Sequence, residues 1–211
     1  KSGTGLLMLT NNNTYSGVTT AGGGVLLLNH ANALPGGIGT TGGTNNLTFN
    51  GGVVGLGVGD FTRSLDAVAT KTAATFTGNG GWAAYNADRV VNLGGASNTI
   101  SWATPSTGLN GKTLILGAPT ATHMVTLQNP LDLDTTPCTV QVDDGAAAVD
   151  ATLSGVLSGI GLTKTGAGTL QLTAANTYFG PTTINGGRLQ AGVAWVPSTS
   201  GAFGLYSAVT L

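Results

Sequence analysis

Four aspartates that follow one another closely give this sequence its best candidates for acid–base chemistry. Asp143 and Asp144 are adjacent, Asp132 and Asp134 lie about ten residues earlier, and His123 precedes them all. Two carboxyl groups about 5 to 9 Å apart can protonate a glycosidic oxygen and activate water or act as a nucleophile, which is the chemistry of polysaccharide-degrading enzymes. Adjacent strand residues face opposite sides, and a glycine follows Asp144, so we interpret this pair as a turn rather than a catalytic dyad.

Other reactive residue types lack the partners that their chemistry requires. The segment GLGVGD at residues 55–60 is a fragment of a calcium-binding repeat, but no further aspartate recurs at that period. Cys138 is the single cysteine and has no metal-ligand spacing around it, so we expect an ordinary buried residue. No Gly-x-Ser-x-Gly motif is present. The sequence therefore predicts no catalytic residue, no metal site and no cofactor.

Aromatic residues are the best candidates for a binding function. Trp82 and Tyr85 in GGWAAYN, together with Trp102 in TISWAT, are candidates for stacking on sugar rings if they share an exposed face. Only 6% of the residues are aromatic, so packing in a core is the competing interpretation. Exposure of the three rings separates these two interpretations.

The composition is far from that of an ordinary enzyme. Of the 211 residues, 36 are glycine and 7% are charged, and all eight acidic residues are aspartate. A net charge of −1 leaves no basic surface for nucleic acid or anionic membrane, so neither is an expected partner. No apolar run reaches the length of a membrane-spanning helix. Because 41% of the residues are hydrophobic and spread throughout, we expect the chain to fold.

An internal repeat organises the chain. Residues 1–28 and 164–191 align without a gap at an offset of about 163 residues and agree at roughly half of their positions. The shared structural positions of the repeat are Gly5, Asn13, Tyr15, Gly17 and Gly24 in the first copy and Gly168, Asn176, Tyr178, Gly180 and Gly187 in the second. Residues 1–163 therefore form one long unit, and residues 164–211 begin a second, so the chain is interpreted as a window of a longer array.

Short runs such as TLQLT and TVQV alternate apolar and polar residues and are separated by Gly, Asn, Asp and Pro, which is typical of strands and turns. Leu7 and Leu9, with Leu170 and Leu172, are expected to point inward. Four glycines, with their counterparts in the second copy, are expected to supply turns with positive φ. These are Gly5, Gly17, Gly23 and Gly24. The long-range repeat favours coils stacked along an axis over a β-sandwich.

The same residues resemble a known family. Residues 164–190 read KTGAGTLQLTAANTYFGPTTINGGRLQ and are similar to the autotransporter-associated β-strand repeat of large bacterial surface proteins. The resemblance covers residues 1–28 and 160–191 closely, and the region between them resembles the spacer of long arrays. It implies a right-handed parallel β-helix at the cell surface or outside the cell, and it assigns no chemical activity.

The sequence thus predicts an all-β, right-handed parallel β-helix (β-solenoid) that acts as a stalk, fibre or surface-layer filament. Its expected partners are other copies, by self-association, or the same array continuing end to end, and a cell-surface polysaccharide is a further candidate. The alternative is an adhesin that binds glycans through an exposed aromatic face, and a polysaccharide-degrading β-helix enzyme is the third interpretation.

Overall fold

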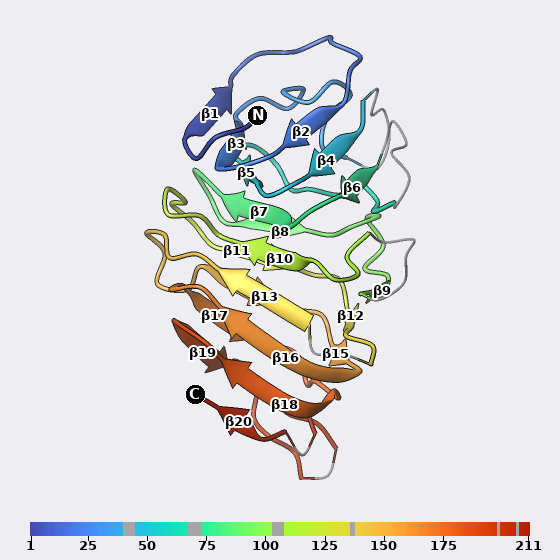
Figure 1. The fold of residues 1–211 in the computed structure, drawn as a ribbon, viewed down its shortest axis with the longest axis vertical. Coiled ribbons are helices and arrows are strands. Elements are labelled where there is room, and N and C mark those ends of the chain that lie inside the picture. The colour runs from blue at the N-terminus through green and yellow to red at the C-terminus, as the bar shows by residue number, and fades with distance from the viewer. Residues whose placement is uncertain (40–44, 67–72, 103–107, 136–137, 198, 206) are drawn as a thin grey trace.

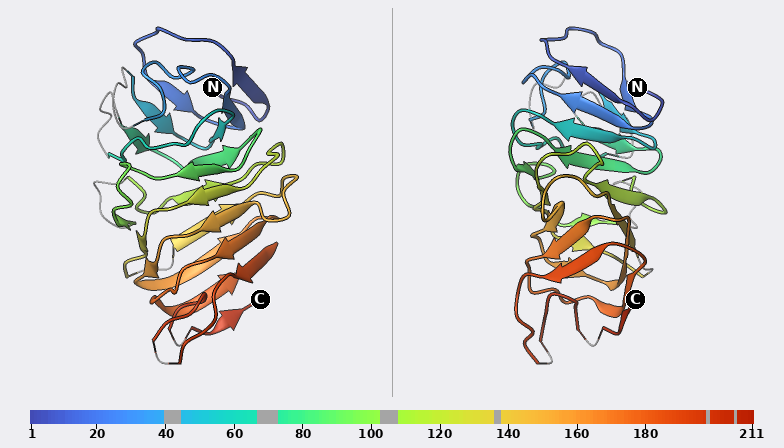
Figure 2. Two further views of the ribbon diagram at one scale, coloured as in Figure 1. Left: turned by 180° about the vertical axis from the view of Figure 1, so that it is seen from behind. Right: turned by 90° about the vertical axis from the view of Figure 1, so that its left-hand side faces the viewer.

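The computed structural model describes residues 1–39, 45–66, 73–102, 108–135, 138–197, 199–205 and 207–211. Across these ranges the chain forms twenty short β-strands and no helix, so none of its described elements is a helix able to cross a membrane. Successive coils stack along the long axis, with the N-terminus near one end and the C-terminus near the other (Figure 1). The same stacking is seen from behind and from the side (Figure 2). The expected all-β solenoid is confirmed.

The largest sheet, sheet A, runs the whole length of the molecule and contains nine strands in the order β1-β3-β5-β7-β10-β13-β16-β18-β20. All of its pairings are parallel, because each strand hydrogen-bonds to the equivalent strand of the next coil. Its strands are β1 (Leu6–Leu9), β3 (Val25–Leu28), β5 (Val53–Leu56), β7 (Gly80–Ala84), β10 (Thr113–Leu116), β13 (Cys138–Val142), β16 (Ile160–Thr165), β18 (Phe179–Ile184) and β20 (Val209–Thr210).

Three smaller sheets, also parallel, form the other faces of the coils. Sheet C contains β8 (Arg89–Val91), β11 (Val125–Leu127), β14 (Ala151–Leu153), β17 (Thr169–Leu172) and β19 (Arg188–Ala191). Sheet D contains β9 (Ile100–Ser101), β12 (Leu131–Asp132) and β15 (Leu157–Ser158). Sheet B contains β2 (Thr19–Ala21), β4 (Leu47–Phe49) and β6 (Ala74–Phe76).

Coil length varies along the stack, and both repeat copies form short coils. Leu6 pairs with Val25 and Thr169 pairs with Arg188, an advance of 19 residues in both copies. By contrast, Val25 pairs with Val53, an advance of 28 residues. The two repeat copies therefore encode the same tight coil in the same register.

The core fills the interior of the stack. Inward positions of the strands carry mainly Leu, Val, Ala and Phe, and a cluster of aromatic rings lies in the N-terminal half. Phe49 stacks on Phe76 with ring centroids 4.6 Å apart, and Trp82 meets Phe49 edge-on at 4.9 Å. Such ring pairs stabilise a core beyond the area that they bury, by about 1 kcal/mol each.

The inward leucines differ between the two repeat copies. Leu170 and Leu172 are fully buried, as expected. Leu7 is 44% exposed and Leu9 is partly buried, because both line an opening of about 240 Å³ at the N-terminal end of the solenoid. Equivalent residues therefore have different burial according to whether a coil covers them on both sides.

Candidate functional site

The two pairs of aspartates considered as candidates for acid–base chemistry lie on either side of β13. Asp132 lies in β12 and Asp143 directly follows β13, so the five residues of β13, about 16 Å of strand, separate them. Asp132 Oδ1 accepts a hydrogen bond from the Asp134 backbone N–H at 3.0 Å, and Asp143 Oδ1 accepts one from Gln141 Nε2 at 2.7 Å. Asp144 is exposed. This separation exceeds the spacing of glycosidase carboxyl groups.

The remaining reactive side chains are similarly engaged in local contacts. His123 Nδ1 lies 2.9 Å from the Thr122 hydroxyl. Burial raises the pKa of the Cys138 thiol to about 12, with the negative charges of Asp134 and Asp132 adding to the shift. The thiol lies 3.2 Å from the Leu133 carbonyl oxygen, to which it donates. In the described ranges no three His, Cys or Asp side chains are grouped so as to hold a metal ion.

Three other aspartates satisfy backbone groups of the following coil. Asp60 Oδ1 accepts the N–H of Val90 at 2.8 Å, and Asp88 Oδ1 accepts that of Met124 at 3.0 Å. Asp150 is buried and accepts the N–H of Thr169 through Oδ2 at 2.8 Å. Each carboxylate thus satisfies an N–H at the entrance of a sheet C strand. The aspartate of GLGVGD has this structural role.

The predicted aromatic face does not exist in the structure. Trp82 is completely buried in the ring cluster of the core, and Trp102 is buried in the same core. Tyr85 packs over Gly55 on the outer side of sheet A, and its hydroxyl lies 2.6 Å from the Thr120 hydroxyl. Buried rings cannot stack on a sugar, so the glycan-binding interpretation of Trp82, Tyr85 and Trp102 is wrong, and the structure supports the competing interpretation that these rings serve packing.

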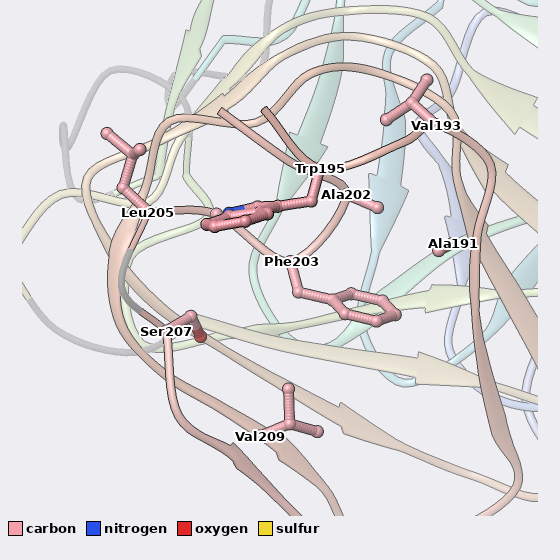
Figure 3. Close-up of a pocket in the computed structure, with 9 residues that line it drawn as sticks. Ala191, Val193, Trp195, Ala202, Phe203, Leu205, Ser207 and Val209 are labelled. Carbon is pink, nitrogen blue, oxygen red and sulfur yellow. The ribbon is translucent and has the colours of Figure 1, made fainter. Parts of the chain in front are cut away.

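An open apolar hollow lies instead at the C-terminal end of the solenoid. Its volume is about 430 Å³, and Trp195 in its wall is 65% exposed. Trp195, Phe203 and Val209 extend toward a common space bordered by the coil that follows β19 (Figure 3). We call this site the C-terminal hollow. Its lining consists of Ala191, Val193, Trp195, Ala202, Phe203, Gly204, Leu205, Ser207 and Val209. Sequence reasoning missed it, because Trp195 lies outside the closely aligned repeat.

A lysine of the repeat makes the same contacts in both copies. Lys1 Nζ donates to the carbonyl oxygens of Ser2, Gly3 and Gly23, at 3.4, 2.7 and 2.8 Å. Lys164 Nζ donates to the equivalent carbonyls of Thr165, Gly166 and Gly186, at 3.0, 2.8 and 3.0 Å. Burial lowers the pKa of Lys164, and the nearby Asp150 and Asp143 partly offset this shift. The ammonium group joins the start of one coil to the turn of the next.

The repeat asparagines anchor the loop of the following coil. Asn13 Nδ2 donates to the Ala33 carbonyl at 2.9 Å, and Asn176 Nδ2 donates to the Ala202 carbonyl at 2.7 Å. Asn176 Oδ1 also accepts the Leu157 N–H at 2.8 Å, which connects it to the preceding coil. These contacts agree with the structural turn role expected for both residues.

The repeat tyrosines each bond a threonine four residues later. The Tyr15 hydroxyl lies 2.7 Å from Thr19 Oγ1, and the Tyr178 hydroxyl lies 2.6 Å from Thr182 Oγ1. Burial raises the pKa of Tyr178 to about 12, and its bonded hydroxyl neighbours reduce that shift. Thr19 is the first residue of β2, and Thr182 lies within β18.

The repeat glycines are required for two different reasons. Gly24 and Gly187 have φ of +56° and +62°, and a Cβ there would lie 2.3 and 2.4 Å from a backbone carbonyl oxygen of the preceding turn. Gly180 and Gly186 also have positive φ, of +92° and +150°. The expectation of positive φ is wrong for the four other positions. These are Gly5, Gly17, Gly23 and Gly168. Gly168 is required for a different reason, because the preceding coil approaches it so closely that a Cβ would not fit.

Comparison with known proteins agrees with this geometry. The profile of the Passenger-associated-transport-repeat matches residues 1–28 and 162–191. Two segments of the chain are therefore similar to this repeat. A curated relative, the "Adhesin BmaC autotransporter" of Brucella suis biovar 1 (strain 1330), is 32% identical over 132 residues, which is 56% of this chain. The chain spans 4% of the length of that relative. No solved structure matches the chain.

Each matched segment contains one tight coil with an advance of 19 residues, together with the lysine, asparagine and tyrosine that make the contacts described above. Passenger repeats of this kind are surface-exposed or secreted, in agreement with the expected location. Two segments of the chain are thus similar to a passenger repeat, and an adhesin is among the relatives of the chain.

Proposed function

We propose that this segment is a structural stalk that extends a passenger away from the cell surface. The observation that carries the proposal is the parallel ladder of sheet A, which runs unbroken from β1 to β20 through every coil. Each coil is stabilised by its two neighbours, so length is gained by adding coils without redesigning a core. A rigid spacer requires this property and requires no reactive site.

The proposal assigns no reaction to the segment. Asp132 and Asp143 accept hydrogen bonds from residues two positions away, and Asp60, Asp88 and Asp150 accept them from the following coil. The two pairs singled out in the sequence are separated by a strand. Parallel β-helix enzymes of polysaccharides use carboxyl groups that face each other across a groove. Such a grouping would be the minimum requirement for an enzymatic role.

Adhesion is the second candidate function, favoured by the name of the relative from Brucella suis. In that case the solenoid would carry a binding surface for cell-surface polysaccharide in addition to acting as a stalk. The exposed Trp195 is an aromatic side chain able to stack on a sugar ring. Binding of the segment to immobilised polysaccharide, with Trp195→Ala as the comparison, tests this candidate.

Electron microscopy of the native material tests the stalk. We expect filaments of uniform width whose axial density repeats once per unit of about 163 residues. Self-association end to end would give filaments longer than one polypeptide can span, whereas continuation of one array would give filaments of fixed length. Compact particles with a single deep groove would contradict the proposal and return attention to a ligand-binding role.

A further inference from the structure

Four asparagines of the chain are followed directly by glycine: Asn50, Asn79, Asn110 and Asn185. Asparagine is among the thermolabile residues. The backbone nitrogen of the next residue can attack the carbonyl carbon of its side-chain amide, and glycine in that place has no Cβ to obstruct the approach. The attack needs a side chain that can turn toward the nitrogen and an N–H that no hydrogen bond holds. The structure separates the four pairs by these two requirements.

Two of the pairs are held by the following coil. The Gly51 N–H donates to the Asn79 carbonyl of that coil at 2.6 Å. Asn79 is held through its side chain, because its Oδ1 accepts the Thr113 N–H at 2.9 Å. Gly80 is also closely packed, since a Cβ there would lie 2.7 Å from Phe49 Cβ. Each of these contacts must open before the nitrogen can attack, so we expect both pairs to react slowly.

The Asn110 pair lies in a turn of its own. Lys112 N–H donates to the Leu109 carbonyl at 2.8 Å and closes the turn around the pair. Both residues of the pair are exposed, and the turn is not part of the junctions that Lys1 and Lys164 hold. Reaction there would leave those junctions unchanged.

The Asn185 pair meets both requirements and lies at a coil junction. Asn185 directly follows β18 and is exposed. In the part of the chain that the structure describes, its side chain makes no hydrogen bond, and neither does the Gly186 N–H. The flanking main-chain groups are bound by Lys164, because Asn185 N–H donates to the Lys164 carbonyl at 2.8 Å and the Gly186 carbonyl accepts Lys164 Nζ at 3.0 Å. The two groups that would react are therefore accessible at the turn that Lys164 holds.

The first repeat copy shows that this accessibility belongs to the turn itself. Gly22 and Gly23 are the equivalents of Asn185 and Gly186. In the first copy the following coil is in place, since Asn50 N–H bonds the preceding coil at 2.8 Å. The Gly23 N–H still makes no hydrogen bond within the described ranges, and Gly22 is partly exposed. A following coil therefore leaves the nitrogen of this turn unbonded.

We propose that Asn185–Gly186 is a site of spontaneous deamidation, at which the chain modifies itself with water as the co-reactant. The Gly186 nitrogen attacks Asn185 Cγ, its proton passes through water to the side-chain amide nitrogen, and ammonia leaves, which closes a cyclic imide. Water then opens the ring at either carbonyl. One product is aspartate, and the other is isoaspartate, in which the main chain is longer by a methylene group. This inference is independent of the proposed stalk.

The isoaspartate form loosens the coil junction. The added methylene group comes directly before Gly186, whose carbonyl is one of the three that Lys164 Nζ binds. Two residues further on, the Arg188 N–H bonds the Gly168 carbonyl at 3.2 Å and begins the pairing of β19 with β17. A longer main chain before Gly186 displaces this carbonyl from Lys164 and disturbs the start of β19.

Incubation of the folded chain at mildly alkaline pH tests the site. Peptide mapping by mass spectrometry follows each asparagine separately, through the mass gained when an amide becomes a carboxyl group, and fragmentation spectra distinguish isoaspartate from aspartate. We expect Asn185 to be converted at least about tenfold faster than Asn50 or Asn79, because those two pairs must first open a hydrogen bond. In concentrated urea the three rates should converge. An unconverted Asn185, equal rates in the folded chain, or a difference that persists in urea would overturn the inference.

Asn185→Gly is the matched control, because it places at this turn the residue that the first copy has as Gly22 and cannot form the imide. We expect amide exchange at Arg188 to rise at least about tenfold in the incubated original chain and to stay unchanged in the incubated control, which still contains Asn110. Freshly purified Asn185→Asp carries the new charge without the longer main chain and should alter this exchange by less than about twofold. Faster exchange at Arg188 in either variant, or unaltered exchange in a chain converted to isoaspartate, would contradict the loosened junction.

Discussion

At the scale of single residues, the buried lysine and arginine side chains bond backbone carbonyls that come together only when successive coils stack. Alignment of the two copies places Lys1 opposite Lys164, but the acceptors of both lysines are main-chain carbonyls. One acceptor of each lysine, the carbonyl of Gly23 or of Gly186, lies 22 residues further along the chain. Every residue has a backbone carbonyl, so the sequence does not indicate which carbonyl a lysine will bond. The buried Arg63 was missed for the same reason, and the buried aromatic rings were ambiguous because composition does not determine which face of a strand a ring occupies.

We expect Lys164→Met to lower the free energy of unfolding by about 1 to 3 kcal/mol, because three carbonyl groups lose a charged donor at the junction of two coils. Lys112→Met is the control, since Lys112 Nζ makes one exposed bond of 3.3 Å to the Asn110 carbonyl. It should change stability by less than about 0.5 kcal/mol. Urea denaturation measures both, and similar losses in the two variants would contradict the joining role of Lys164.

At the scale of elements, alternation of apolar and polar residues located many strands correctly, including β13 and β17, whose burial patterns alternate along the strand. The turns were predicted less well. Glycine has two uses in this fold, positive φ and close contact between coils, and a sequence does not distinguish them. Gly168 shows the second use, because a Cβ there would lie 2.7 Å from the Asp143 carbonyl oxygen and 2.8 Å from Asp150 Oδ2.

The same repeat position should therefore respond differently in its two copies. We expect Gly168→Ala to destabilise the protein by about 1 to 3 kcal/mol through overpacking against the preceding coil. Gly5→Ala should be tolerated within about 0.5 kcal/mol, because a Cβ at Gly5 meets nothing within 4 Å. Midpoints of chemical unfolding for the two variants check this, and an equal effect at both positions would mean that backbone conformation, and not coil contact, sets the requirement.

At the scale of the whole molecule, the architecture could be predicted because the internal repeat, the strand patterning and the family resemblance all indicated stacked coils. The division into residues 1–163 and 164–211 stays a prediction. The C-terminal hollow could not be predicted, since its lining is brought together by the path of the chain after β19 and not by a regular spacing of residue types.

Stability should depend little on ionic strength. The net charge is −1 and only 7% of the residues are charged, so screening has few interactions to weaken. We expect the free energy of unfolding to change by less than about 0.5 kcal/mol between about 0.05 M and about 1 M sodium chloride. Thermal or urea unfolding across this range checks it, and a loss above about 1 kcal/mol would reveal a charge network that the fold does not display.

The parallel stacking of coils also determines how the molecule would respond to a pulling force. A load applied to its two ends acts along the axis and opens the ladder one coil at a time from an end, because each coil is held only by its neighbours. Each released coil of 19 residues yields about 65 Å of extended chain. Such a tether lengthens stepwise and dissipates work, and it can shorten again as coils restack when the load is removed.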